Sequence, residues 1–109
     1  MEEKALNYYL GKNESPKYNC AQSVLACFTD DIQLIEKFAE YGKGKAPENT
    51  CGAIYAAMQL CKDKKTIEDY FTNLAGSIKC QDIRASKKIS CLDCVRLAAR
   101  MSKESLRTQ

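Results

Sequence analysis

Cysteine is the residue type best able to do chemistry in this sequence. The chain of 109 residues contains seven Cys and no His. Seven thiols are more than packing alone requires in a reducing compartment, and a cysteine-rich chain in such a compartment is typical of metal binding or redox chemistry. The absence of His excludes His-ligated zinc, a Cys–His nucleophilic pair and the commonest general base. Any chemistry in this chain therefore belongs to sulfur.

Two of the cysteines follow residues that begin helices well. Cys51 follows a helix cap at Asn49 or Thr50, and Cys91 follows a cap at Ser90. The first turn of a helix presents unpaired N–H groups and the positive end of the helix dipole, and both stabilise a thiolate. We therefore predict that Cys51 and Cys91 are redox thiols of low pKa. The alternative is that small residues simply fit at buried helix starts.

Small residues follow Cys51. Gly52 stands in the first turn of the expected helix, where glycine is less stabilising than alanine, and a close approach by another backbone or by a ligand would explain it. Alternatively, Gly52 belongs with Ala53, Ala56 and Ala57 to a face of small side chains that packs tightly against a second helix. Both interpretations stay open at the level of the sequence.

The other cysteines carry weaker signals. Cys27 and Cys61 lie in the middle of apolar helical stripes, and we assign both to the core because a free Cys packs as a small hydrophobe. Cys20 shares the stripe of Cys27, and Cys80 lies near the end of a helix, so their neighbours do not decide their roles. Cys94 completes a C-x-x-C with Cys91, but the sequence lacks both the βαβ context of a thioredoxin-like dithiol and the second C-x-x-C of a common zinc site.

The elements that position these residues are expected to be helices, because apolar residues recur at helical spacing and no convincing strand pattern is present. The expected helices cover Glu3–Leu10, a segment from Pro16 or Asn19 to Phe28, Asp31 to Gly42, Asn49 or Thr50 to Cys61, Thr66 to Ile78 and Cys91 to Leu106, with a short basic connector at 81–89. We predict one domain over residues 1–109, an all-α fold made of a small bundle of about five helices.

Charge and hydropathy narrow the classes of function. The formal net charge is +3, and residues 79–109 carry eight basic against three acidic side chains. No aromatic residue follows Phe71, whereas single-strand binders need aromatic platforms among their basic groups, so we expect no nucleic-acid binding. No apolar run is long enough for a membrane span, and the N-terminus lacks the apolar block of a signal peptide. We therefore expect a cytoplasmic protein. The basic end is interpreted as a solvated helix face, with docking to an acidic redox partner as the alternative.

Four segments in order resemble a known family. They are N-C-A-Q-S-V-L-A-C-F, C-G-A-I-Y-A, G-S-I-K-C and C-x-x-x-V-x-x-A-A, spread from Tyr18 to Met101. They resemble the C_GCAxxG_C_C family, which is named for its cysteines and is described as redox-active. The resemblance implies that the site residues are Cys20, Cys51, Cys80 and Cys91, with Cys94 as an alternative ligand to Cys91. This chain has Ala56 where the family pattern ends in glycine.

Two classes of function follow. In the first, the four cysteines form one redox site, either as ligands of an iron–sulfur cluster or as a cycling dithiol–disulfide system, with a redox partner protein. In the second, they form a structural Cys₄ zinc site or are merely buried, and the chain is a helical interaction or scaffold module. Zinc is the weaker cofactor, because three of the four cysteines are separated by about 30 residues. An enzyme with Cys51 as nucleophile has no visible base, and the oligomeric state is open, with a homodimer among the alternatives.

Overall fold

The computed structural model describes residues 2–12, 16–42, 45–61 and 63–107, and these residues form an all-α fold. A single isolated β-bridge, between Thr50 and Lys79, is the only extended pairing among them. The predicted fold class is therefore confirmed. The helices are α1 (Glu2–Leu10), α2 (Cys20–Leu25), α3 (Ile32–Lys37), α4 (Gly52–Leu60), α5 (Lys64–Ala75), α6 (Cys80–Ser86) and α7 (Cys91–Arg107), with two 3₁₀ helices at Phe38–Tyr41 and Pro47–Asn49.

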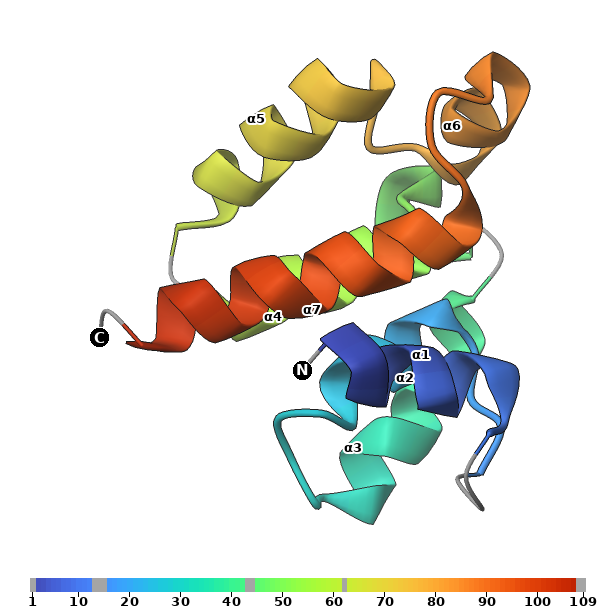
Figure 1. Cartoon of the computed structure of the whole chain (residues 1–109), viewed down its shortest axis with the longest axis vertical. Coiled ribbons are helices and arrows are strands. Elements are labelled where there is room, and N and C mark those ends of the chain that lie inside the picture. The colour runs from blue at the N-terminus through green and yellow to red at the C-terminus, as the bar shows by residue number, and fades with distance from the viewer. Residues whose placement is uncertain (1, 13–15, 43–44, 62, 108–109) are drawn as a thin grey trace.

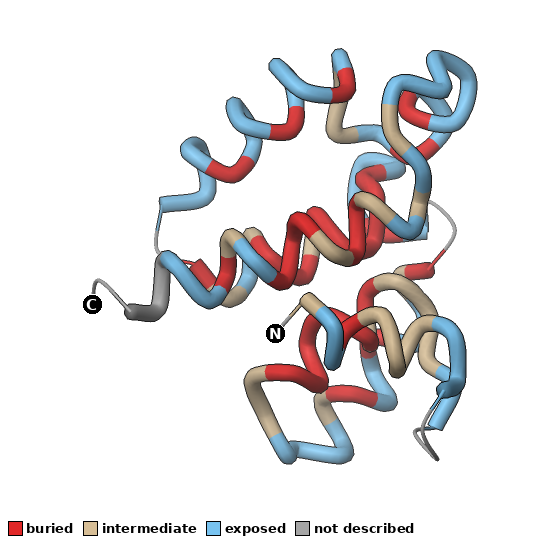
Figure 2. The backbone as a smooth tube through the Cα atoms, viewed as in Figure 1, coloured by how far each residue is buried: buried red, intermediate tan, exposed pale blue. Residues whose placement is uncertain are grey.

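Two helices form the centre of the molecule. Helices α4 and α7 lie side by side, with α1, α2 and α3 on one side of them and α5 and α6 on the other (Figure 1). Helix α7 also packs against α1 and α2, and α4 packs against α2 and α5. The buried residues follow this arrangement, since they concentrate on α4, α7 and the inner faces of the helices around them (Figure 2).

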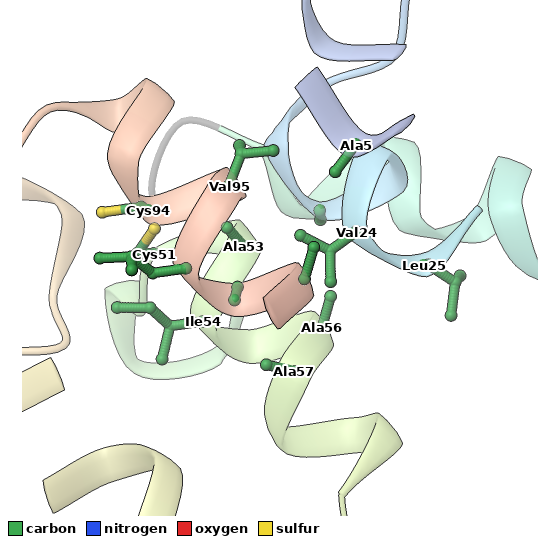
Figure 3. Packing of buried hydrophobic residues seen from close by; sticks show 14 of the residues in the cluster. Ala5, Val24, Leu25, Cys51, Ala53, Ile54, Ala56, Ala57, Cys94 and Val95 are labelled. Carbon is green, nitrogen blue, oxygen red and sulfur yellow. The ribbon is translucent and has the colours of Figure 1, made fainter. Parts of the chain in front are cut away.

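Small side chains let the central helices approach one another. Ala53, Ala56 and Ala57 of α4 and Ala98 and Ala99 of α7 are completely buried. The side chains of α4 and α2 meet in the same cluster (Figure 3). The helix-packing interpretation is thus confirmed for Ala53, Ala56 and Ala57. Cys27 and Cys61 also lie in this core, as predicted.

Local capping sets where the helices that carry cysteines begin. Asn19 is the N-cap of α2: its side chain accepts from the Gln22 N–H at 2.8 Å, and the Gln22 side chain accepts from the Asn19 N–H at 3.1 Å. This capping box decides between the two expected starts of that helix, and Ser15 lies outside the described residues. Ser90 caps α7 in the same way, since its Oγ accepts from the Asp93 N–H at 3.0 Å. Both boxes place a cysteine at the first helical residue.

Several of the expected helix boundaries were wrong. The N-cap of α4 is Cys51 itself rather than Asn49 or Thr50, so this helix begins at Gly52. The cap of α5 is Asp63, whose carboxylate accepts from the Thr66 N–H at 3.1 Å, so Thr66 lies inside the helix rather than before it. The expected connector at 81–89 contains helix α6. Ile83 is the only buried hydrophobic residue between Cys80 and Ser90, so the apolar periodicity that would announce α6 is missing from the sequence.

Candidate functional site: a cavity lined by four cysteines

A cavity of about 540 Å³ collects the four predicted site residues. Cys20, Cys51, Cys80 and Cys91 all line it. They come from four different helices and are spread over most of the sequence. The remaining lining residues are Tyr9, Leu10, Lys17, Tyr18, Asn19 and Arg84.

Each of the four cysteines stands at the beginning of its helix. Cys20, Cys80 and Cys91 are the first residues of α2, α6 and α7, and Cys51 is the N-cap of α4. Four helix starts therefore meet at one cavity. Since the first turn of a helix presents N–H groups without intrahelical partners, this arrangement surrounds the thiols with positive partial charge.

An extended link holds the start of α4 against the segment that leads into α6. The Cys51 N–H donates to the carbonyl of Ile78 at 2.8 Å, and Thr50 and Lys79 form the isolated β-bridge. These backbone contacts join two segments that are far apart in the sequence. They bring Cys51 and Cys80 to the same cavity.

Gly52 permits the closest approach in the site. A Cβ atom at this position would lie 2.5 Å from the Tyr41 carbonyl oxygen and 2.8 Å from the Cys20 Sγ atom. Both distances are shorter than side chains tolerate, and the nearer atom belongs to the backbone. The glycine is therefore explained by a backbone and a thiol that press against the start of α4, as one interpretation of the sequence proposed.

Three sulfur atoms form a chain from the cavity into the core. Cys51 interacts through side-chain hydrogen bonds with Cys20 on one side and with Cys94 on the other. Cys94 is buried in the core cluster and does not line the cavity, so the structure gives no support to Cys94 as a substitute for Cys91 at this surface. Figure 3 shows the side chains of Cys51 and Cys94 next to each other.

The expected low pKa of Cys51 was wrong. The hydrogen bond with Cys20 lowers the pKa of Cys51. The hydrogen bond with Cys94, burial and the charge of Cys94 raise it, and the resulting pKa is about 12. The Ile54 N–H, in the first turn of α4, contributes a lowering smaller than any of these. Desolvation opposes ionisation of a buried thiol, and here it outweighs the helix start.

Arg84 of α6 stands beside the other two cysteines. A hydrogen-bonding interaction with Cys91 is the main cause that raises the pKa of the Arg84 guanidinium, followed by the charges of Cys80 and Cys91. Burial raises the pKa of Cys80, while Arg84 lowers it and Cys91 and Cys20 raise it. Cys80, Arg84 and Cys91 therefore form a second group of interacting side chains.

The sequence analysis missed Arg84 because it placed this residue in a connector. On a helix, Cys80 and Arg84 are one turn apart and share a face, so the recognition of α6 would have identified it. Arg84 is largely exposed to solvent, and its only sequence signal was membership of the basic end of the chain.

Residues of α1 and of the segment before α2 form the remaining wall. Tyr9 lies among the cysteines, since burial, then the charges of Cys91 and Cys20, raise the pKa of its hydroxyl. Tyr18 is held by a backbone hydrogen bond to the Tyr8 carbonyl at 2.9 Å and by ring contact with Tyr8 at a centroid distance of 5.3 Å. Within the described part of the chain, no acidic side chain lines the cavity.

The described residues show neither a disulfide nor an assembled site for one metal ion. No disulfide joins any of the cysteines, and no group of three or more Cys, Asp or Glu side chains in residues 2–12, 16–42, 45–61 and 63–107 is arranged to hold a metal ion. None of the helices described is long and apolar enough to cross a membrane.

Comparisons of this chain with family models, with curated proteins and with solved structures found no match. The resemblance to the C_GCAxxG_C_C family therefore stays a prediction that depends on the four cysteine-bearing segments.

Proposed function

We propose that this chain is a thiol redox protein whose four cavity cysteines act together by dithiol–disulfide exchange. The observation that carries the proposal is the meeting of Cys20, Cys51, Cys80 and Cys91 on one cavity from four helix starts. Packing alone does not require four thiols at one opening, since Cys27 and Cys61 show how this core accommodates cysteines that only pack.

The four thiols divide into two pairs with different surroundings. Cys80 and Cys91 flank Arg84, and Cys91 is the half-exposed member. Cys51 is buried and interacts with the half-exposed Cys20. The attacking sulfur in disulfide exchange must be reachable by the incoming disulfide, so the more exposed thiol of a pair reacts first. We therefore assign the first attack to Cys91, with Cys80 as its resolving thiol, and treat Cys20 and Cys51 as the inner pair.

This assignment moves the attacking role away from Cys51. A pKa of about 12 leaves Cys51 protonated at neutral pH, so it is a poor first nucleophile. Within an inner pair it can still form a disulfide with Cys20. The Cys20 thiolate attacks the Cys80–Cys91 disulfide and one outer thiolate leaves; Cys51 then attacks Cys20 in this mixed disulfide, loses its proton and releases the second outer thiolate. The proposal keeps both cysteines predicted from the sequence in the site, with different roles.

An iron–sulfur centre is the second candidate, favoured by the same four thiols on one cavity. Its donor set suits the usual Cys₄ ligation, and the positive helix starts with Lys17 and Arg84 suit an anionic cluster. Such a cluster would supply one-electron transfer.

The deciding experiment is an absorption spectrum with iron, sulfide and zinc analysis on protein purified without oxygen, followed by titration with a disulfide redox buffer. Colourless, metal-free protein whose cavity thiols oxidise reversibly in pairs supports the proposal. Mass-spectrometric mapping should locate the disulfides among Cys20, Cys51, Cys80 and Cys91. Visible bands that bleach on reduction, together with iron and sulfide, would replace thiol exchange by an iron–sulfur cluster as the function of the site. Stoichiometric zinc, or thiols that never pair, would overturn the redox function.

A further inference from the structure

The cavity is larger than exchange among its four thiols requires. Tyr9 and Leu10 of α1, with Lys17 and Tyr18 of the following segment, form a wall that carries no cysteine. The volume of about 540 Å³ lies within the range in which proteins bind small molecules, roughly 300–1,000 Å³. The site therefore has room for a small organic molecule beside the sulfur atoms.

A second cavity borders the first. Its volume is about 290 Å³, and Arg84 and Cys91 line both cavities. The other residues of this smaller cavity are Ile83, Lys87, Ile89 and Ser90. Cys91, the thiol to which we assign the first attack, thus lines two cavities, and Arg84 lines both as well.

The charges around these spaces have one sign. Lys17, Arg84 and Lys87 are the only charged residues among the described residues that line either cavity, although the whole chain has 14 acidic residues. Asp93, in the first turn of α7, accepts a hydrogen bond from the Ser90 N–H through its carboxylate and pairs with Arg96. Cationic walls with aromatic surface favour an organic anion.

We propose that the substrate of this site is a small organic disulfide that carries acidic groups, held by Arg84 and Lys17 with its sulfur atoms at Cys91. This inference depends on the proposed thiol redox function and names its substrate class. Arg84 is suited to both tasks, because one guanidinium can pair with a carboxylate and stand beside the attacking sulfur.

The exchange balances without a further reactant. The Cys91 thiolate attacks one sulfur of the substrate, a bond forms between Cys91 and that sulfur, and the substrate S–S bond breaks to release the first thiolate. The Cys80 thiolate then attacks the Cys91 sulfur, the Cys80–Cys91 disulfide forms, and the second substrate thiolate leaves. Two protein thiols lose two electrons and two protons in total, and one small disulfide becomes two thiols.

The test compares three small symmetric disulfides of different charge: dithiodipropionate, which is anionic, hydroxyethyl disulfide, which is neutral, and cystamine, which is cationic. The rate constant for oxidation of the reduced, full-length protein is measured for each and divided by the rate constant of the same reagent with mercaptoethanol. This division removes differences in leaving group. Mass spectrometry of quenched samples identifies the first cysteine to carry an adduct.

We expect the normalised rate to be about tenfold or more higher for dithiodipropionate than for cystamine at low salt, with the first adduct on Cys91 and with a smaller ratio at high salt. Arg84→Gln and Lys17→Gln should each reduce this ratio. Lys103→Gln is the matched control. It removes one positive charge about 18 Å along α7 from Cys91 and should leave the ratio unchanged.

Equal normalised rates for the three reagents would overturn the anionic substrate class while the thiol redox function stood. No reaction with any of them, in protein whose thiols are shown to be reduced, would overturn both. Because Arg84 and Lys17 are exposed, both variants should fold. The salt dependence of the wild-type protein tests the inference independently of either variant.

Discussion

The Sγ atom of Cys20 lies against the α-carbon face of Gly52, where an added Cβ would stand 2.8 Å from the sulfur and 2.5 Å from the Tyr41 carbonyl oxygen. One glycine thus lets three segments meet: the start of α2, the end of the first 3₁₀ helix and the start of α4. Because Cys51 directly precedes Gly52, the same contact sets the distance between the two thiols of the inner pair.

Gly52→Ala should therefore damage both stability and the inner pair. The carbonyl of Tyr41 belongs to the backbone and cannot rotate away, so we expect a loss of about 1–3 kcal/mol in the free energy of unfolding. Displacement of Cys20 should also slow formation of the Cys20–Cys51 disulfide. Urea denaturation and disulfide mapping measure the two effects.

The control for this variant is Ala56→Gly, one turn further along α4. It should cost about 1 kcal/mol through helix propensity and leave the disulfide pattern unchanged. Wild-type stability and wild-type pairing in Gly52→Ala would show that the close approach at Gly52 does not exist in solution.

Cys51→Ser and Cys27→Ser should separate function from packing. Cys51 belongs to the cavity, so its loss should abolish the inner disulfide during redox titration. Cys27 lies in the core and its thiol donates to the Ser23 carbonyl at 3.3 Å, so a serine there should lower stability by about 1–3 kcal/mol without any change in pairing. If both variants cycle their remaining thiols in the same way, Cys51 has no special role.

Cys94→Ala should make Cys51 more acidic. The hydrogen bond with Cys94 and the charge of Cys94 both raise the pKa of Cys51, and alanine removes both while it keeps the site apolar. The midpoint of the pH profile for alkylation of Cys51 by iodoacetamide should then fall below about 12. Cys61→Ala removes another buried thiol and serves as the comparison, and an unchanged midpoint in Cys94→Ala would contradict the assigned cause.

Stability should fall at alkaline pH. The folded state keeps the thiols of Cys51 and Cys27 protonated to pKa values of about 12 and about 11, whereas an unfolded thiol ionises near pH 8.5. Their contribution is therefore fully present below about pH 8.5 and is lost as the pH rises toward the folded values. Between these limits each thiol should lower the free energy of unfolding by about 1.4 kcal/mol per pH unit.

Urea denaturation under reducing conditions at about pH 8 and about pH 10 measures this loss. Tyrosine and lysine also titrate in this range, so the informative quantity is the difference between wild-type protein and Cys27→Ala, which lacks one of the two thiols. A variant that loses as much stability as the wild-type protein would show that Cys27 does not ionise on unfolding.

The sequence by itself determined the features that depend on neighbouring residues. Helical periodicity predicted an all-α chain, capping residues such as Asn19 and Ser90 placed cysteines at helix starts, and apolar stripes assigned Cys27 and Cys61 to the core. These features follow from contacts within a few residues, which a single sequence contains in full.

Only the tertiary structure decided how the cysteines act on one another. The residues alone singled out Cys51 and Cys91, and the family resemblance added Cys20 and Cys80, but the common cavity arises from the packing of α2, α4, α6 and α7. The raised pKa of Cys51 reversed the expectation from its helix start, because it depends on burial and on a sulfur atom that lies 43 positions away in the sequence at Cys94. Arg84 became a site residue only through a helix with too little apolar surface to be predicted. Desolvation and contacts between distant segments are properties of the folded chain, and no local pattern encodes them.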